Sequence, residues 1–192
     1  MEKDILIDRL NYIMIKKDCI ALAEQFVCME DGITILFELC QSDNEKLSFH
    51  AAWVLENALT SNPDIFSLNL SKIIELIPTI KNSSAQRHFS KLLNIAMSNC
   101  SKNIFPKDAC ELLKNVDMEP IVETCFEWLI DKNSKPAVKA HCMDILLFLT
   151  MRYEWIKEEL PYVIEHQLID ATLGVENKGR KILYYLKRNF QN

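Results

Sequence analysis

One pattern of apolar residues occurs four times along the chain, and it constrains the fold more than any other feature. Its first occurrence lies within residues 45–60, where Val54 and Leu55 follow Ala51 by three and four residues and so share one face of an α-helix. Equivalent windows start at Leu47, Ala85, Val138 and Lys178, with offsets of 38, 53 and 40 residues. A helix that returns at such a period predicts an array of stacked helical units.

Partner helices are predicted between these four segments. Apolar residues recur at helical spacing over roughly Leu70–Ile80, Met118–Ile130 and Trp155–Ala171. Three glycines and six prolines in 192 residues are too few for the many tight turns of an all-β chain, and a hydrophobic content of 49% is enough to build one core. We therefore predict an all-α protein with a single domain over residues 1–192.

The remaining segments fit the same plan. Residues 4–30 predict two helices and Ile33–Gln41 predicts a third. Pro106 marks the start of a short extra helix, because proline is favoured in the first helical turn. This extra helix accounts for the longer offset before the third window. The expected units are 1–61, 62–99, 100–152 and 153–192.

A period near 40 residues, two helices per unit and polar turns between them resemble the HEAT and armadillo repeat families. The pair Val138-Lys139, which follows Asp131, is similar to the Val-Arg pair after an aspartate-containing turn in HEAT repeats, whereas the other three units lack a basic residue at this place. The resemblance implies a right-handed α-α superhelix of about four helical hairpins. It also implies that the second helix of each hairpin lines a concave surface.

The second helices of the four hairpins can be aligned by their apolar pattern. Residues that lie next to the core face of each helix then occupy equivalent positions, called columns here. Three of the four histidines of the chain fall in one column, and an aromatic residue stands at each end of the next column. The candidate concave-face binding residues are Phe49, His50, Trp53, His88, Lys91, His141, Asp144, Lys181 and Tyr184.

The histidine column has several interpretations. Histidines on neighbouring helices could bind a metal ion, respond to pH or contact an anion. Successive helices in such an array lie about 10 Å apart, so two of these histidines could share an ion but three could not. We favour the interpretation that they cap the core between units, and we expect no metal or other cofactor.

The aromatic residues of the column also have two interpretations. Trp53 and Tyr184 could anchor a partner, because such residues dominate binding interfaces. They could equally fill the gap between hairpins. Phe49 supports a binding role, because it is expected to point away from the core and would be exposed unless a partner covered it.

Charged residues concentrate in an acidic stripe and in a basic segment, 177–192, that has no acidic residue. The stripe contains Glu119, Glu123, Glu127 and Asp131, and the basic segment contains Lys178, Arg180, Lys187 and Arg188. We expect the stripe to be a solvated convex face and the basic helix to cap the array. The basic segment could instead contact phosphates, or the acidic stripe of a second copy in a homo-oligomer, for which end-to-end contact is the other route.

The cysteines and the N-terminal segment predict the location of the protein. Seven cysteines, without a Cys-x-x-Cys motif, stand mostly in apolar helical surroundings, and we interpret them as buried free thiols in a reducing compartment. The first ten residues mix charged and apolar types and lack the features of a signal peptide. No apolar run reaches the length of a membrane span. We expect a cytoplasmic protein without a membrane partner.

No catalytic signature is present, since the chain lacks the hydrolase, phosphate-loop and zinc-peptidase motifs. The leading hypothesis is a non-enzymatic scaffold or adaptor whose concave face binds an unidentified protein partner. The alternative is a DNA-binding protein similar to the HEAT-like alkylpurine DNA glycosylases, with Trp53, Asp144 and Tyr184 as its aromatic and acidic groups. A net charge of −5 argues against nucleic acid, because duplex binding draws on several Lys and Arg contacts.

Overall fold

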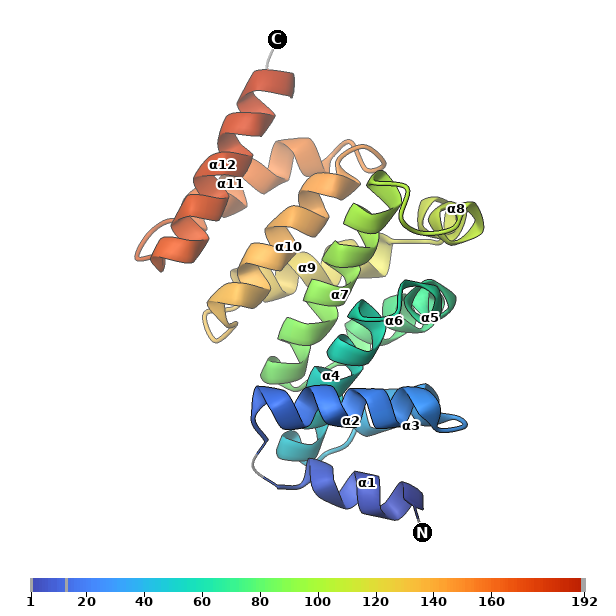
Figure 1. Ribbon diagram of the computed structural model, residues 1–192. Coiled ribbons are helices and arrows are strands. Elements are labelled where there is room, and N and C mark those ends of the chain that lie inside the picture. Colours follow the sequence, from blue (N-terminus) through green and yellow to red (C-terminus); the bar gives the residue numbers. More distant parts are fainter. Residues whose placement is uncertain (1, 13, 191–192) are drawn as a thin grey trace.

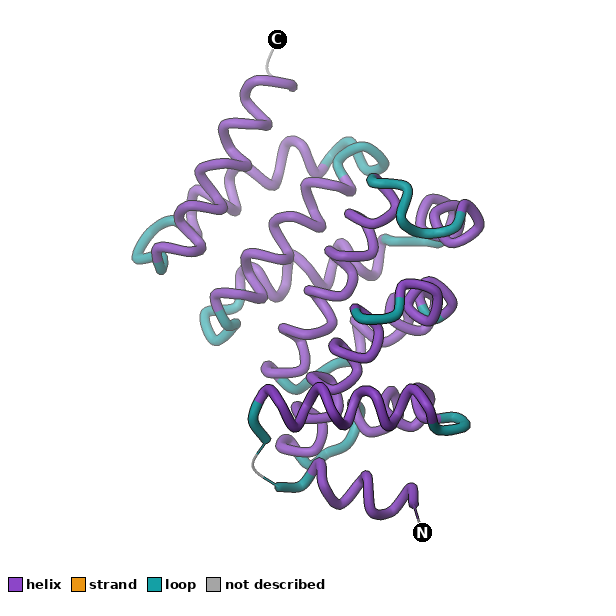
Figure 2. Tube along the Cα trace, in the orientation of Figure 1, coloured by secondary structure: helices purple, strands orange, loops and turns teal. Residues whose placement is uncertain are grey.

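The computed structural model describes residues 2–12 and 14–190, and all regular structure within them is helical (Figures 1 and 2). The α-helices are α1 (Glu2–Leu10), α2 (Lys16–Cys28), α3 (Gly32–Cys40), α4 (Glu45–Thr60), α5 (Pro63–Leu68), α6 (Leu70–Leu76), α7 (Ser83–Ser101), α8 (Lys107–Asn115), α9 (Glu119–Ile130), α10 (Pro136–Leu149), α11 (Ile156–Gln167) and α12 (Leu173–Phe190), and a 3-10 turn, η1 (Ile77–Thr79), follows α6. No strand occurs within these described ranges, and the prediction of an all-α fold is confirmed.

Four helical hairpins follow one another along the array. They pair α3 with α4, α6 with α7, α9 with α10 and α11 with α12, while α2 packs along α4. The helices α4, α7, α10 and α12, called the inner helices below, pack each on the next, and Figure 1 shows them as a row that runs from the N-terminal to the C-terminal part of the molecule. The helical array predicted from the periodicity is therefore the observed fold.

Two short helices interrupt the regular hairpins, and both depend on a proline. The extra helix α8 begins at Lys107, directly after Pro106, as the sequence predicted. The other, α5, was not predicted. Pro63 ends α4 and also occupies the first position of α5, where its missing N–H would have no helical partner in any case.

An asparagine begins each of the first two inner helices. Asn44 and Asn82 occupy equivalent positions, and Oδ1 of each accepts hydrogen bonds of 2.8 to 3.1 Å from the backbone N–H groups two and three residues later. Asn82 Nδ2 also donates to the carbonyl of Glu45 in the first turn of α4, at 2.8 Å. The residue that caps α7 thus also fastens α7 to the preceding inner helix.

The aligned apolar columns line the core of the array. Ala51, Phe89 and Cys142 are fully buried on successive inner helices, and each fully buried side chain of Val, Leu, Ile or Phe contributes roughly 1.5–3 kcal/mol. Tyr185 on α12 is equivalent to the buried Val54 of α4 but is 48% exposed, since within the described residues no hairpin follows α12. None of the described helices is long and apolar enough to span a membrane.

A disulfide joins the end of α7 to α8. It links Cys100 to Cys110, whose Cα atoms lie 5.4 Å apart. The turn between them depends on Asn103, whose φ of 55° lies in the left-handed region that asparagine tolerates. The backbone N–H groups of Asn103 and Ile104 donate to the carbonyls of Cys100 and Asn99, at 3.1 and 2.9 Å, and so close α7 and turn the chain toward α8.

The other five cysteines are free, and four of them, Cys19, Cys40, Cys125 and Cys142, are buried. Burial raises the pKa of the Cys19 thiol to about 12 and also raises that of Cys40, so both stay protonated at neutral pH. Cys28 is exposed. The prediction of buried free thiols is therefore confirmed for these four cysteines and wrong for Cys28 and for the bonded pair.

Candidate functional site

Polar side chains beside the core connect each inner helix to the next. This set, called the polar ladder below, consists of Glu56 on α4, His88, Lys91 and Asn94 on α7, His141 and Asp144 on α10, and Lys178 on α12. Every member contacts a member on a neighbouring inner helix. Equivalent positions of successive repeats therefore meet at the α4–α7 and α7–α10 boundaries, whereas Asp144 and Lys178 join α10 to α12 through a different pair of positions.

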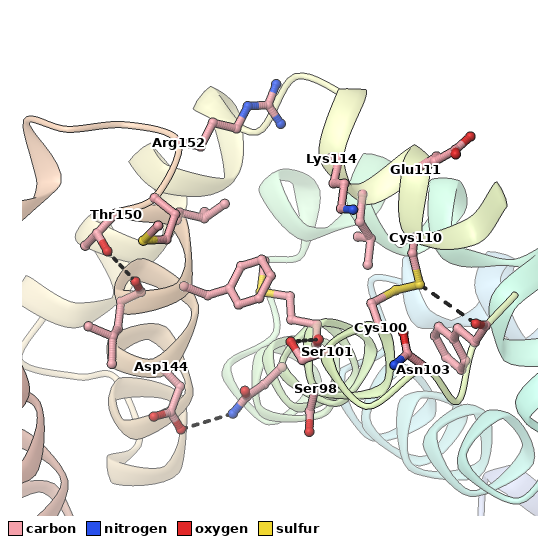
Figure 3. Close-up of a pocket in the computed structure, with 18 of the residues that line it drawn as sticks. Ser98, Cys100, Ser101, Asn103, Cys110, Glu111, Lys114, Asp144, Thr150 and Arg152 are labelled. Carbon is pink, nitrogen blue, oxygen red and sulfur yellow. Dashed lines mark hydrogen bonds between the residues drawn. A yellow bond between two sulfur atoms is a disulfide. The ribbon is translucent and has the colours of Figure 1, made fainter. Parts of the chain in front are cut away.

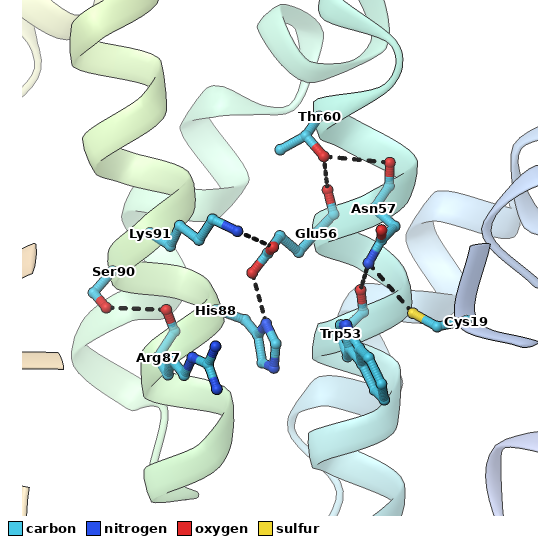
Figure 4. Close-up of polar contacts among 9 residues, drawn as sticks. All are labelled: Cys19, Trp53, Glu56, Asn57, Thr60, Arg87, His88, Ser90 and Lys91. Carbon is cyan, nitrogen blue, oxygen red and sulfur yellow. Dashed lines mark hydrogen bonds and ion pairs between the residues drawn. The ribbon is translucent and has the colours of Figure 1, made fainter. Parts of the chain in front are cut away.

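The contact between α4 and α7 is closed around one carboxylate (Figure 4). Glu56 Oε2 lies 2.7 Å from His88 Nδ1, and Glu56 Oε1 accepts a hydrogen bond of 2.5 Å from Lys91 Nζ. Only 10% of the Glu56 side chain and 5% of the His88 side chain are exposed. Burial acts to raise the pKa of Glu56, but the hydrogen bonds from His88 and Lys91 outweigh it and hold the pKa below its ordinary value. Glu56 is thus ionised and links α4 to α7.

The contact between α7 and α10 has an amide at the position where the contact between α4 and α7 has a carboxylate. Asn94 Nδ2 donates to Asp144 Oδ2 at 3.1 Å and lies 3.3 Å from His141 Nδ1. Asp144 also pairs with α12, where Lys178 Nζ lies 2.7 and 2.9 Å from its two carboxylate oxygens. Burial lowers the pKa of His141 below its ordinary value, although the negative charge of Asp144 opposes this shift. His141 is therefore neutral at pH 7.

The histidine column lies at the boundaries between packed elements. His50 is buried, and its Nδ1 lies 2.6 Å from the carbonyl oxygen of Leu10 at the end of α1. His88 and His141 reach α4 and α7 in the same direction, whereas Lys181 at the end of the column is exposed. In the part of the chain that the structure describes, no group of three His, Cys, Asp or Glu side chains could hold a metal ion. Each of these three histidines therefore contacts a residue of another helix, as expected for side chains at the boundary between two helices.

The aromatic residues of the inner face differ in their exposure. The Phe49 ring stacks on Trp53 with the centroids 6.0 Å apart, and it lies 5.7 Å from the ring of His88. Phe49 is consequently half-buried, and the expectation that it would be exposed unless a partner covered it is wrong, because Trp53, one turn further along the same helix, covers part of its ring. Trp53 is half-buried as well, whereas Tyr184 is 67% exposed.

The two charged patches differ in how far they are engaged within the chain. All four residues of the acidic stripe, on α9 and directly after it, are exposed. In the basic segment, Lys178 is bound to Asp144, and Arg180 Nη2 lies 2.8 Å from Glu176 Oε1. Lys187 and Arg188 are exposed near the end of α12. Two cations of the basic segment, Lys178 and Arg180, are therefore already paired within the chain.

A pocket of about 1180 Å³ between α7, α8 and α10 was not predicted from the sequence (Figure 3). Its lining includes Asn94 and Asp144 of the polar ladder, the Cys100–Cys110 disulfide, and Tyr185 of α12. The one signal in the sequence was the longer offset before the third window, because the inserted helix α8 supplies a wall of this pocket.

A family model described as a HEAT repeat domain matches residues 6–186 of the chain. The match extends over all four hairpins and over α2, which packs on the first of them. No curated protein and no solved structure was found to match the chain.

Proposed function

The chain belongs to the HEAT repeat domain family, and on this premise we propose that it is a non-enzymatic scaffold that binds a protein segment along its inner helices. Stacked repeats form extended curved surfaces, on which a partner can contact several repeats at once. Packed helices lie about 8–10 Å apart, so four of them offer a surface roughly 25–30 Å across, which suits a segment of several residues.

The observation that supports this function most is a column of accessible side chains. The inner-face row consists of the residues at one equivalent position on the four inner helices: Trp53, Lys91, Asp144 and Tyr184. Trp53 is half-buried, and the Lys91 side chain is 41% exposed. The Asp144 side chain is 26% exposed and Tyr184 is 67% exposed. An aromatic residue at each end of the row offers the large contact area that anchors protein interfaces.

The two charged members of the row are held in place before any partner arrives. Glu56 holds Lys91 at 2.5 Å, and Lys178 holds Asp144 at 2.7 Å. A partner that contacts them loses less conformational entropy than one that must order free side chains. Charges of both signs between two aromatic anchors also favour one orientation of the bound segment over its reverse.

The test compares two exposed tyrosines in a pull-down with the full chain as bait. Tyr184 belongs to the inner-face row, whereas Tyr162 is 71% exposed on α11. The first helices of the four hairpins, α3, α6, α9 and α11, are called the outer helices. We expect Tyr184→Ala and Trp53→Ala each to lower the amount of retained partner about tenfold, and Tyr162→Ala to leave it unchanged. Circular dichroism melting confirms that the variants fold. Equal retention by all three folded variants would contradict the proposed function.

A further inference from the structure

We propose that the pocket between α7, α8 and α10 is a second binding site, and that it takes an acidic peptide segment with one bulky apolar side chain. The pocket borders the inner-face row and shares Asp144 with it. Three properties of the pocket define this partner: exposed apolar side chains, a wall fixed in advance, and an excess of positive charge among the lining residues.

Large apolar side chains remain exposed to solvent inside the pocket. Phe148, Met151 and Tyr185 line it and are 44%, 79% and 48% exposed. The buried side chains of Phe105 and Leu149 line it as well. Apolar surface that gathers in a hollow marks an interaction site, because a ligand that covers it removes it from water. We therefore expect one bulky apolar side chain of the partner to enter here.

The α8 wall of the pocket is attached to its neighbours near both ends. The disulfide ties Cys110 in α8 to Cys100 in α7. After the end of α8, the carbonyl of Val116 accepts a hydrogen bond of 2.5 Å from Arg152 Nη1. A wall held at two points keeps the pocket formed without a ligand, which lowers the entropic cost of binding.

The charges around the pocket select an acidic partner. Three exposed cations line it: Lys107, Lys114 and Arg152. Glu111 opposes them, whereas Asp144 is already paired with Lys178. The pocket is thus locally positive, although the whole chain carries a net charge of −5. Figure 3 shows Arg152 and Lys114 along one edge of the pocket and Asp144 toward the opposite edge.

The pocket is large enough to hold part of a peptide. Small-molecule sites usually enclose about 300–1000 Å³, and this pocket has a volume of about 1180 Å³. A peptide can place an apolar side chain against Phe148 and acidic side chains near the lysines of α8. Nucleic acid is less well suited, because binding to its backbone usually draws on more Lys and Arg contacts than the three cations that line this pocket.

A random dodecapeptide phage library, panned on the immobilised full chain, provides the probe. We expect the recovered peptides to place Asp or Glu around a Leu, Phe or Trp. One recovered peptide is then synthesised with a fluorescent label, and its Kd is measured by fluorescence polarisation. Phe148→Ala and the double variant Lys107→Glu with Lys114→Glu are each expected to raise this Kd about tenfold or more. Both lysines are exposed, so the double variant tests the site even where Phe148→Ala disturbs packing.

Two control variants separate this site from general charge effects and from the inner-face row. Lys132→Glu reverses an exposed charge outside the pocket and is expected to change the Kd less than about twofold. Trp53→Ala is also expected to leave the Kd unchanged. If Trp53→Ala abolished binding while the pocket variants retained it, the peptide would belong to the inner-face row, and the pocket proposal would be wrong. Recovery of peptides without acidic residues, or displacement of the peptide by a single-stranded DNA oligonucleotide, would overturn it as well.

Discussion

The contact between α4 and α7 and the contact between α7 and α10 use equivalent helix positions but differ in their chemistry. Between α4 and α7, the buried carboxylate of Glu56 is held by His88 and Lys91. Between α7 and α10, Asn94 takes the place of Glu56 and Asp144 takes the place of Lys91, and both line a pocket. The first contact is a closed ion-pair network, whereas the second opens to solvent.

The difference shows that a repeat position fixes where a side chain lies, while the neighbouring helices decide what it contacts. Asn57 on α4 corresponds to Phe148 on α10. The amide nitrogen of Asn57 lies 3.3 Å from Sγ of Cys19 on α2, so a neighbouring helix covers this position. Phe148 instead lines the pocket and is 44% exposed. Closed contacts of this kind stabilise the array, and open ones remain available to a ligand.

Removing the buried carboxylate is expected to have the largest effect on stability. Glu56→Ala leaves the buried His88 ring without its hydrogen-bond partner and Lys91, whose side chain is 41% exposed, without its ion-pair partner. We expect the free energy of unfolding to fall by about 3 kcal/mol, the upper end of the range for a buried group that loses its hydrogen bond. Asp144→Ala, at the equivalent of Lys91 in the open contact, is expected to cost about 1 kcal/mol or less, because that pair is partly solvated. Urea unfolding at neutral pH measures both. Similar losses in the two variants would remove the distinction between the contacts.

The next largest effect is expected from the disulfide, which restrains only the pocket side. Replacing Cys100 and Cys110 by serine removes a link between residues ten positions apart, for which loop-closure entropy predicts a loss of about 2–3 kcal/mol. Hydrogen exchange should accelerate in α8 and stay unchanged in α4. Cys28→Ser, at an exposed free cysteine, is the control, with an expected change within about 0.5 kcal/mol. Equal stability of the double variant and the control would refute this role of the disulfide.

Acid is expected to weaken the two contacts in different pH ranges. Burial lowers the pKa of His141 in the folded chain, so as pH falls below about 6.5 the unfolded chain binds a proton that the folded chain does not, and stability decreases. The lowered pKa of Glu56 contributes stability that is lost only below about pH 4.5. His141→Asn should therefore flatten the loss of unfolding free energy between about pH 7 and pH 5. His166→Asn, at an exposed site on α11, should not, and an unchanged slope in His141→Asn would contradict the assignment.

The smallest effect on stability is expected in the pocket itself. Phe148→Ala removes a ring that is 44% exposed, so the free energy of unfolding should change by only about 0.5 kcal/mol. The same variant is expected to lose the peptide described above. Urea unfolding and fluorescence polarisation on one preparation would show whether binding and stability separate at this residue. A loss of several kcal/mol would instead place Phe148 among the core residues.

The fold follows from the sequence because each helix is specified locally. The apolar spacing placed one helix over residues 45–60, and α4 has these bounds. The same alignment put His50, His88 and His141 at equivalent positions, and each of them contacts a residue of an earlier helix against which its own helix packs. Helical periodicity carries this information because residues three and four apart must share a face.

Contacts between separate helices could not be predicted from the sequence, because they depend on distances in space that the spacing of residues along the chain does not give. Cys100 and Cys110 form no recognised motif and meet only because Asn103 turns the chain in a left-handed conformation. Phe49 is covered by Trp53, so its place on the helix did not reveal its burial. The partner of Glu56 could not be named either, since the closing of that contact requires the packing of α4 on α7.

The central claim is that the inner helices, and not the outer ones, meet the protein partner. Hydroxyl-radical footprinting with mass spectrometry tests it directly, because it reports the exposure of aromatic side chains in the free and bound chain. Binding of the partner retained in the pull-down should protect Tyr184 and Trp53 from labelling. Tyr162 on α11 and Trp155 directly before α11, which are 71% and 44% exposed, should be labelled as in the free chain. Protection of Tyr162 and Trp155 with unchanged labelling of Tyr184 and Trp53 would contradict the claim.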